Sequence, residues 1–193
     1  MFLIILAAGK SKRFENTIPK QYTKLGNKTI LEHSLDAFSD FQQIKKTILV
    51  YNKKHKKYLK KLNLKNVIKI TGGDTRQQST FKALSKIKNM HCKKVLIHDS
   101  ARPFPSKELI KKIISNIKKN DAVIPIIRIN DATKQVEKNI VFKNIERDNL
   151  RLAQTPQGFT FKKIYEKHKN NSYEQFDDDA ALFTNDNEKV LCV

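Results

Sequence analysis

Apolar and polar positions alternate with two different periods along the chain, and each period predicts one kind of element. Residues 2–6 form a continuous apolar run that ends at Ala7-Ala8-Gly9, as expected of a buried parallel strand that leads into a loop. Similar patterns predict strands at 46–51, 67–71, 93–98 and 122–127. Helical spacing predicts helices between them, at 29–38, 53–62, 76–87 and 106–117. This order predicts an α/β fold class, with an open, mostly parallel sheet and helices on both faces.

Two of the predicted helices carry clear start signals. The stretch Thr29-Ile30-Leu31-Glu32 has the pattern of a capping box, in which the first and fourth residues satisfy each other's backbone N–H groups. Ser106 stands where an N-cap residue would begin the helix at 106–117.

The segment 131–147 has a different pattern. Apolar and polar residues alternate over 133–137 and again over 140–145, on either side of Lys138-Asn139, which predicts a β-hairpin. A two-stranded hairpin is poorly stable alone in water, so we expect this arm to pack on something, plausibly a second copy of the chain.

Length and charge narrow the class of protein. The chain has 193 residues, 39% of them hydrophobic, which fits one globular domain over 1–193. The net charge of +20 raises the idea of a polyanion-binding protein. However, 33 of the 39 basic residues are lysines spread over nearly every segment, which favours a solvated lysine coat over a specific nucleic-acid surface.

The cysteines and the N-terminus bear on the compartment. Cys92 and Cys192 are far apart, with no CxxC pattern and no histidine at metal-ligand spacing, so neither a disulfide framework nor a zinc site is indicated. The apolar run 2–8 has no basic residue before it and is too short for a signal peptide or a membrane span. We expect a cytoplasmic protein that does not bind membranes.

Candidate chemistry lies in three segments that directly follow predicted strands, where open α/β sheets bind ligands. The first is 6–14 with Pro19-Lys20-Gln21-Tyr22, a small-residue turn with several cations. The second is 72–79, which begins with two glycines. The third is 98–104, where Asp99 stands between a histidine and an arginine. Taken singly, each has a structural alternative: an ordinary basic turn, a tight turn, and an ion pair between Asp99 and Arg102. A phosphate-binding P-loop is disfavoured, because Ile4 stands where its first glycine would be.

Taken together and in order, these segments resemble the 2-C-methyl-D-erythritol 4-phosphate cytidylyltransferase family of non-mevalonate isoprenoid synthesis. The matching stretches are Leu6-Ala7-Ala8-Gly9, Pro19-Lys20-Gln21, Gly72-Gly73 with Arg76 and Ser79, His98-Asp99-Ser100-Ala101-Arg102-Pro103, Arg147-Asp148-Asn149-Leu150 and Thr155-Pro156-Gln157. The resemblance extends over essentially the whole chain.

The resemblance implies a Rossmann-like nucleotidyltransferase sheet with a protruding hairpin arm and transfer of CMP from CTP to a sugar-alcohol phosphate, with Mg²⁺ or another divalent cation. It implies Arg13 and Lys20 as the cations that stabilise the transition state, and Asp99 as the metal ligand. The nucleotide would be bound by Ala8, Gly9, Gly73, Asp74 and Ser79. The sugar phosphate would be bound by Asp99, Thr133, Arg147 and Thr155, with Arg147 reaching the neighbouring subunit of a homodimer joined through the arm.

Several departures from the family pattern stand out. Ser11 replaces the usual second glycine of the first motif, which suggests a less open phosphate loop, and Ser100 replaces an alanine. Ala132 occupies the usual threonine position in the segment Asp131-Ala132-Thr133-Lys134. The sequence ends at the strand 190–193, whereas the family continues with a lysine-containing segment and a helix. We therefore expect a truncated chain or one part of a fusion with a later enzyme of the pathway.

Two rival functions remain open from the sequence. A ribitol 5-phosphate cytidylyltransferase has similar loops, although Leu6-Ala7-Ala8-Gly9 and Gln154-Thr155-Pro156-Gln157 favour methylerythritol phosphate as the acceptor. A polyanion-binding module on a nucleotidyltransferase-like fold would explain the charge of +20, but not why the candidate motifs fall at strand ends.

Overall fold

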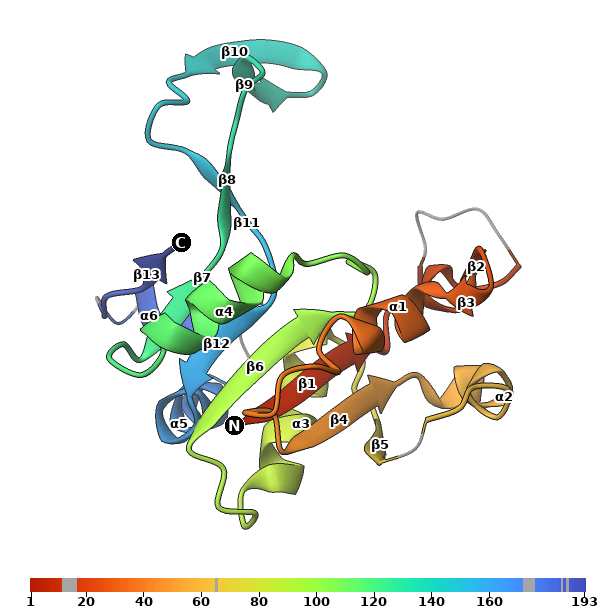
Figure 1. Ribbon diagram of the computed structural model, residues 1–193. Helices are drawn as coiled ribbons and strands as arrows, with labels where there is room; N and C mark the ends of the chain where they lie inside the picture. The colour runs from red at the N-terminus through yellow and green to blue at the C-terminus, as the bar shows by residue number, and fades with distance from the viewer. Residues whose placement is uncertain (12–16, 65, 172–175, 185, 187) are drawn as a thin grey trace.

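A seven-stranded sheet lies at the centre of the computed structural model, which describes residues 1–11, 17–64, 66–171, 176–184, 186 and 188–193 (Figure 1). The strand order is β13-β7-β12-β6-β1-β4-β5. Only β12 runs antiparallel to its neighbours among these strands. The bounds are β1 (Phe2–Ala7), β4 (Lys46–Tyr51), β5 (Val67–Thr71), β6 (Lys94–Asp99), β7 (Ala122–Ile124), β12 (Gln157–Thr160) and β13 (Leu191–Cys192). The predicted open, mostly parallel α/β sheet is confirmed.

Helices cover both faces of this sheet because β1 is apolar on both sides. Phe2, Ile4 and Leu6 pack into one core with α3 and α5, whereas Leu3 and Ile5 pack into a second core with α1 and α4. The alternation follows the period of two along a strand. The helices are α1 (Ile30–Asp36), α2 (Lys56–Leu59), α3 (Arg76–Ile87), α4 (Lys107–Asn116), α5 (Phe161–Asn170) and α6 (Ala181–Thr184).

The local start signals act as expected. The Thr29 side chain accepts a hydrogen bond from the Glu32 N–H, and the Glu32 carboxylate accepts one from the Thr29 N–H at 2.7 Å, which completes the capping box of α1. Ser106 accepts from the Leu109 N–H and is the N-cap of α4. The predicted strand at 67–71 and the predicted helix at 76–87 match β5 and α3 residue for residue.

The predicted helix at 53–62 is wrong in extent. The structure has a 3₁₀ turn, η2 (Lys53–His55), followed by the single turn of α2. Lysines three and four positions apart repel one another on a helix surface, and Leu59 is the one buried residue of α2, so little packing energy opposes that repulsion.

The predicted strand at 122–127 is also interrupted. It divides at Pro125, which has no N–H to donate, into β7 and β8 (Ile126–Arg128). β8 leaves the main sheet and pairs antiparallel with β11 (Arg151–Ala153). This two-stranded stem connects the main sheet to the arm.

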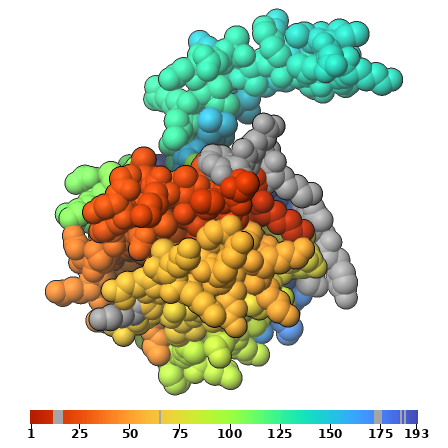
Figure 2. Space-filling view, turned by 90° about the vertical axis from the view of Figure 1, so that its right-hand side faces the viewer, coloured from red at the N-terminus to blue at the C-terminus, as the bar shows by residue number. Residues whose placement is uncertain are grey.

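The arm is the predicted hairpin, and it projects away from the sheet (Figures 1 and 2). Strands β9 (Thr133–Glu137) and β10 (Ile140–Ile145) pair antiparallel. Lys138 and Asn139 both have positive φ, at 46° and 67°, as a two-residue type I′ turn requires.

Two small elements and the lysines complete the description. A 3₁₀ turn, η1 (Lys20–Tyr22), precedes the short hairpin of β2 (Lys24–Leu25) and β3 (Lys28–Thr29).

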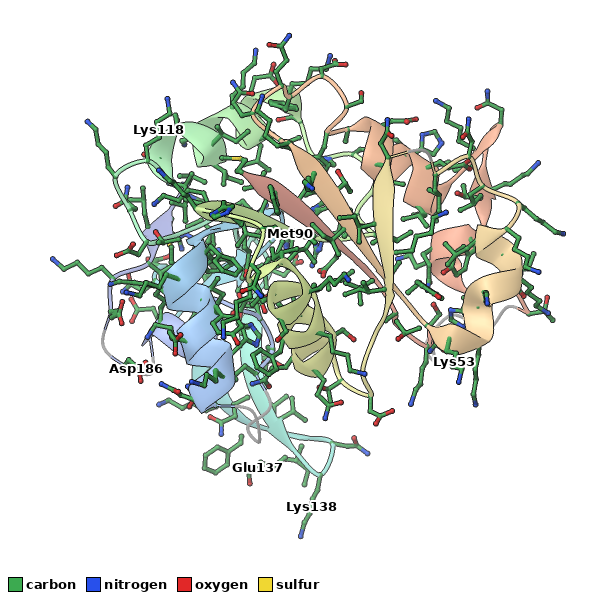
Figure 3. The ribbon with its side chains drawn as sticks, turned by 90° about the horizontal axis from the view of Figure 1, so that it is seen from below. Lys53, Met90, Lys118, Glu137, Lys138 and Asp186 are labelled. Carbon is green, nitrogen blue, oxygen red and sulfur yellow. The ribbon has the colours of Figure 1, made fainter. Side chains whose placement is uncertain are left out.

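The labelled side chains of Lys53, Lys118 and Lys138 belong to three distant parts of the surface and point outward (Figure 3). This distribution agrees with a solvated lysine coat.

Order along the chain determines where a ligand can bind. From β1 the chain proceeds outward through β4 and β5, and then returns to the other side of β1 as β6. Connections therefore diverge on either side of the β1–β6 boundary and leave a crevice beyond the carboxyl ends of these two strands.

Candidate functional site

The crevice beyond β1 and β6 is a cavity of about 900 Å³, a volume typical of small-molecule sites. The lining residues come from the three predicted segments: the turn after β1 together with η1, which carries Lys20 and Gln21, the turn after β5, and the end of β6. The lining residues are Leu6, Ala8, Gly9, Lys10, Ser11, Lys20, Gln21, Gly73, Asp74, Thr75, Arg76, Ser79, Asp99, Ser100, Ala101 and Arg102.

Gln21 holds the turn after β1 in place. Its buried side-chain amide donates to the carbonyl oxygens of Ala7 at 2.8 Å and Gly9 at 3.1 Å. Ser11 has a φ of 52°, a left-handed conformation that favours glycine. The Ser11 hydroxyl offsets this strain, because it accepts from the Lys20 N–H and donates to the Gln21 side chain. The Ser11 side chain thus links the turn after β1 to η1.

The turn after β5 needs both of its glycines. A Cβ on Gly72 would lie 2.5 Å from the Ala8 Cβ and 2.8 Å from the Ser79 Oγ, and one on Gly73 would lie 2.5 Å from the Gln78 Cβ. The Ser79 hydroxyl accepts from the Gly73 N–H at 3.0 Å and donates to the Thr75 carbonyl oxygen. Ser79 therefore shapes the turn from inside, 3% exposed, while Gly73 and Asp74 line the cavity.

Asp99 ends β6 and faces two arginines. Its Oδ1 lies 3.4 Å from the Arg76 Nε, and its Oδ2 lies 3.4 Å from the Arg102 Nε. The ion pair considered from the sequence between Asp99 and Arg102 is present, but it is long and part-exposed. Exposed pairs of this kind are weak, so the Asp99 carboxylate can still bind a cation in the cavity.

Beneath Asp99, a buried histidine shapes the backbone. The Thr155 hydroxyl accepts from the Asp99 N–H at 3.2 Å and lies 2.9 Å from the His98 Nδ1, and the His98 Nε2 lies 2.9 Å from the Arg102 carbonyl oxygen. A proton on Nε2 satisfies all three contacts. Burial lowers the pKa of His98 to about 4, so the ring is neutral near pH 7.

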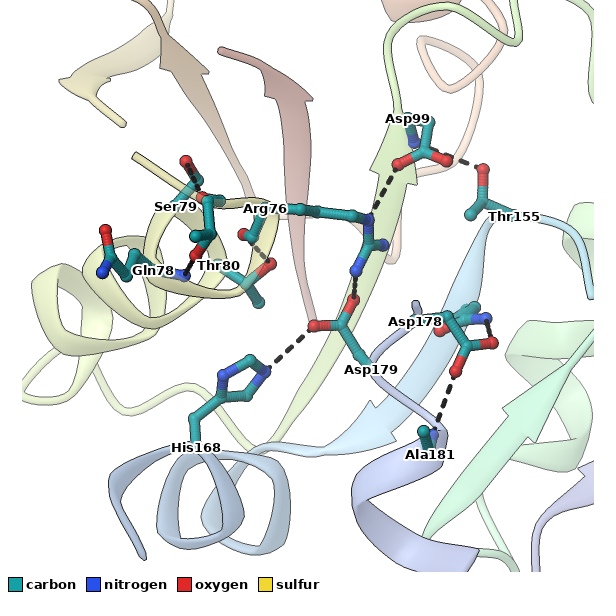
Figure 4. Close-up of polar contacts among 12 residues, drawn as sticks. Arg76, Gln78, Ser79, Thr80, Asp99, Thr155, His168, Asp178, Asp179 and Ala181 are labelled. Atoms are coloured by element: carbon teal, nitrogen blue, oxygen red, sulfur yellow. Dashed lines mark hydrogen bonds and ion pairs between the residues drawn. The ribbon is translucent and has the colours of Figure 1, made fainter. Parts of the chain in front are cut away.

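A second buried group lies on the other side of Arg76 (Figure 4). The Arg76 Nη1 is 2.7 Å from the Asp179 Oδ2, and the His168 Nε2 is 2.9 Å from the Asp179 Oδ1. Burial by itself would raise the pKa of Asp179, but the charge of Arg76 and the contacts with His168 and Arg76 together outweigh burial and lower the pKa to about 2. Asp179 is therefore a buried carboxylate anion.

The cavity is electropositive and suits a polyphosphate. Its described lining carries four cations, Lys10, Lys20, Arg76 and Arg102, and two carboxylates, Asp74 and Asp99. The described residues contain no cluster of three or more His, Cys, Asp or Glu side chains that could by itself hold a metal ion. Mg²⁺ is commonly bound through one or two carboxylates together with substrate phosphates, and Asp99 fits that mode.

The structure brings most of the predicted site residues together. Seven of them line the cavity: Ala8, Gly9, Lys20, Gly73, Asp74, Ser79 and Asp99. Arg13 lies outside the described residues. Thr155 is under the end of β6, with its hydroxyl bonded within the chain. Thr133 and Arg147 are on the arm and do not belong to the described lining of this cavity, and the Arg147 guanidinium donates to the Asn130 carbonyl oxygen.

Some residues of the site were not singled out from the sequence. Arg76 and Gln21 were each part of a quoted motif without an assigned role, so a signal for them existed. Asp179 and His168 gave no signal, because they lie 80 and 69 residues after Asp99 along the chain and belong to neither a quoted motif nor a predicted strand end. Only the fold brings them to Arg76.

The fold and the site define a class of protein: an α/β nucleotide-binding domain with a cation-rich cavity at the switch point of its sheet. The whole chain, residues 1–193, matches the family model of IspD, 2-C-methyl-D-erythritol 4-phosphate cytidylyltransferase. The chain belongs to this family. The family resemblance inferred from the sequence is confirmed.

Named relatives agree with this assignment. The chain is 48% identical over 190 residues to the bifunctional enzyme IspD/IspF of Pelagibacter ubique, covering 98% of this chain and 51% of that protein. It is 36% identical over 186 residues to the 2-C-methyl-D-erythritol 4-phosphate cytidylyltransferase of Thermosipho melanesiensis, covering 93% of this chain and 82% of that protein. The chain thus spans about half the length of the bifunctional relatives that it matches.

Solved structures share the fold. The bifunctional IspDF of Campylobacter jejuni superposes with a TM-score of 0.85 at 32% identity, covering 100% of this chain and 48% of that one. The 2-C-methyl-D-erythritol 4-phosphate cytidylyltransferase of Francisella tularensis superposes with a TM-score of 0.83 at 33% identity, covering 100% of this chain and 88% of that one. Within the described residues, no helix has the length and apolar character needed to cross a bilayer.

The buried His98 predicts a pH-dependent stability. Because the pKa of His98 is about 4 in the folded chain and 6.5 ordinarily, the unfolded chain takes up this proton first as the pH falls. The free energy of unfolding should therefore decrease from pH 6.5 to about pH 4, with a contribution from His98 on the order of 3 kcal/mol. Above pH 6.5 both states are neutral at this residue, and the contribution is flat.

Urea unfolding of wild type and His98→Gln at a series of pH values measures this effect. The variant should be less stable at pH 7 but lose less stability on acidification. His91→Gln, which removes an exposed histidine, should keep the wild-type slope. Parallel curves for His98→Gln and wild type would show that His98 is not the residue responsible.

Proposed function

We propose that this chain transfers CMP from CTP to 2-C-methyl-D-erythritol 4-phosphate, releasing pyrophosphate and forming 4-diphosphocytidyl-2-C-methyl-D-erythritol for isoprenoid precursor synthesis. The observation that carries the proposal is the cavity at the β1–β6 boundary, which four cations line together with a carboxylate, Asp99, that is available to a metal ion. Membership of the family supports the same reaction. The names of the relatives support methylerythritol phosphate as the acceptor.

The proposed reaction is a single in-line displacement. A phosphate oxygen of the sugar phosphate attacks the α-phosphorus of CTP and forms a new P–O bond. The bond from the α-phosphorus to the bridging oxygen breaks, and its electron pair leaves with pyrophosphate. No covalent enzyme intermediate is needed, so the protein contributes by positioning the reactants and by stabilising negative charge.

The residues divide between the two halves of the nucleotide. Lys20 and Lys10, on neighbouring segments of the cavity wall, are placed to stabilise the triphosphate and the developing charge. Gly73 and Asp74, on the turn after β5, are placed for the cytidine. Arg13 belongs to the same proposal as a second transition-state cation, on the strength of its motif position alone.

Mg²⁺ is the proposed cofactor, and Asp99 would hold it together with phosphate oxygens of CTP. When bound, the ion neutralises negative charge on the triphosphate and so favours attack at phosphorus. Arg76 and Arg102 hold the Asp99 carboxylate from both sides, and Thr155 holds its backbone N–H. These contacts orient the carboxylate before any ligand arrives.

A cytoplasmic location is part of the same proposal. Cys92 is buried and Cys192 is exposed, and both are free thiols. Reducing compartments keep cysteines in this state.

The reaction and the role of Lys20 are tested in one assay. Pyrophosphate release from CTP should require methylerythritol phosphate and Mg²⁺, and ribitol 5-phosphate should be a poor acceptor. Lys20→Ala should reduce turnover by about 10²-fold or more, because a preorganised charge that acts in the transition state is lost. Lys24→Ala, an exposed lysine outside the cavity lining, should keep wild-type turnover.

The outcomes separate the alternatives. Equal rates with ribitol 5-phosphate would contradict the proposed acceptor. Near-normal turnover by Lys20→Ala would contradict the proposed catalytic role. No turnover with either acceptor, together with tight binding of duplex DNA above roughly 200 mM salt, would favour the polyanion-binding module instead.

The arm supports a proposal of a homodimer. Its large apolar side chains are exposed within one chain: Val136 at 55%, Ile140 at 71%, Val141 at 59% and Phe142 at 67%. Ile127 and Leu152 on the stem are exposed as well. An apolar, two-stranded arm of this kind is stable when it is covered, and a second copy of the chain is the simplest cover.

In the proposed dimer, Arg147 of one subunit completes the sugar-phosphate site of the other. Arg147 lies at the base of the arm, outside the described lining of its own chain's cavity. Thr133 begins the first strand of the arm and belongs to the same proposal. The sugar-phosphate role of Thr155 is the less direct one, because its hydroxyl already has two partners within the chain.

Mixing two inactive variants tests this arrangement. Subunits carrying Arg147→Ala and subunits carrying Lys20→Ala should recover activity on mixing, because one site of each heterodimer then has both residues. With random exchange, about a quarter of all sites should be intact. As a control, wild type mixed with the double variant Lys20→Ala/Arg147→Ala should form heterodimers with no intact site. A heterodimer that keeps one active site in that control would show that Arg147 acts within its own chain.

A further inference from the structure

Arg76 lies between two carboxylates that it contacts unequally (Figure 4). Its Nη1 is 2.7 Å from Asp179, which is 1% exposed, whereas its Nε is 3.4 Å from Asp99, which is 30% exposed. A short contact away from water is electrostatically stronger than a longer contact beside solvent. The positive charge of Arg76 is therefore balanced chiefly by Asp179. Arg76 neutralises the negative charge of Asp99 only in part, so this carboxylate can still attract a cation in the cavity.

Asp179 is itself held firmly in position. His168 of α5 contacts its second carboxylate oxygen, and this ring is 1% exposed and stacks on Phe81 of α3. The preceding residue, Asp178, accepts from the Ala181 N–H and from the Gln157 side chain, so the turn that carries Asp179 is also tied down. Neither Asp179 nor His168 belongs to the described lining of the cavity.

A buried ion pair of this kind is a poor source of stability. Taking both charges out of water costs about as much as their attraction returns, so packing alone does not account for the arrangement. Removing only the carboxylate charge would leave Arg76 without its main partner. The guanidinium would then turn to its one other described carboxylate partner, Asp99, and compete there with a cation.

We propose that Asp179 and His168 are positioning residues, which hold Arg76 so that it orients Asp99 without neutralising it and leaves this carboxylate free to bind a divalent cation with CTP. The inference rests on the proposed function, because it concerns the carboxylate assigned to the metal. The inference adds Asp179 and His168 to the residues that the site needs, and neither belongs to the sequence motifs or to the described lining of the cavity.

The test measures binding without turnover. Isothermal titration calorimetry gives the Kd of CTP with and without Mg²⁺ in the absence of the sugar phosphate, and the ratio of the two values is the gain from the metal. Asp179→Asn, nearly equal in volume to the native residue, should reduce this gain by about tenfold or more, as loss of an outer partner of a metal ligand commonly does. Removing the competing cation in the double variant Arg76→Met/Asp179→Asn should restore part of it, because Arg102 and Thr155 still hold Asp99.

Asp186→Asn is the matched control. It also removes an ion pair to a largely buried cation of α5, since the Asp186 Oδ2 lies 2.5 Å from the Nζ of Lys167, but it has no described contact with Arg76. This variant should keep the wild-type gain. If it loses as much as Asp179→Asn, a general loosening of α5 is responsible and the inference is overturned.

The remaining outcomes are also decisive. A wild-type gain in Asp179→Asn would assign Asp179 a purely structural role. A double variant as weak as Asp179→Asn would show that the loss does not act through Arg76, and either result overturns the inference. Asp99→Asn separates the inference from the proposed function: if wild type shows a gain that Asp99→Asn abolishes, the metal site stands whatever Asp179 does, whereas the absence of a gain in wild type contradicts the metal site itself.

Discussion

The carboxyl end of β1 is the constraint on which the site depends. The chain leaves this strand toward β4 on one side and comes back as β6 on the other, so three separate turns meet at one edge of the sheet. Their backbones approach closely enough that Gly72 has no room for a side chain beside Ala8. The cavity is therefore a consequence of strand order, and its chemistry comes from the residues that happen to end each strand.

Around this cavity, charges are arranged in layers. Lysines and arginines face the open space, Asp99 lies among them, and Asp179 is behind Arg76 in the protein interior. Neutral buried groups hold the backbone of the same strand end, with His98 and Thr155 under Asp99. Orientation fixed before a ligand binds is what displacement at phosphorus requires from a protein that forms no covalent intermediate.

The arm follows a different logic from the sheet. Its strands and central turn have a local hairpin pattern, but within one chain the large apolar side chains of both strands remain in solvent. A local pattern can specify a hairpin and its turn, as the positive φ values of Lys138 and Asn139 illustrate. It cannot specify what covers the hairpin, because that depends on a surface belonging to another part of the assembly.

Sequence by itself determined the elements whose signals are local: the capping box at Thr29, the helix 76–87 and the strand-end motifs that converge on the cavity. It misjudged 53–62 and 122–127, where lysine repulsion and Pro125 outweighed the apolar periodicity. Tertiary structure alone decided that Asp179 and His168 lie behind Arg76, since they come from a turn and a helix far along the chain. Periodicity records which side of an element is buried. The residues that pack against that side depend on how the whole chain folds.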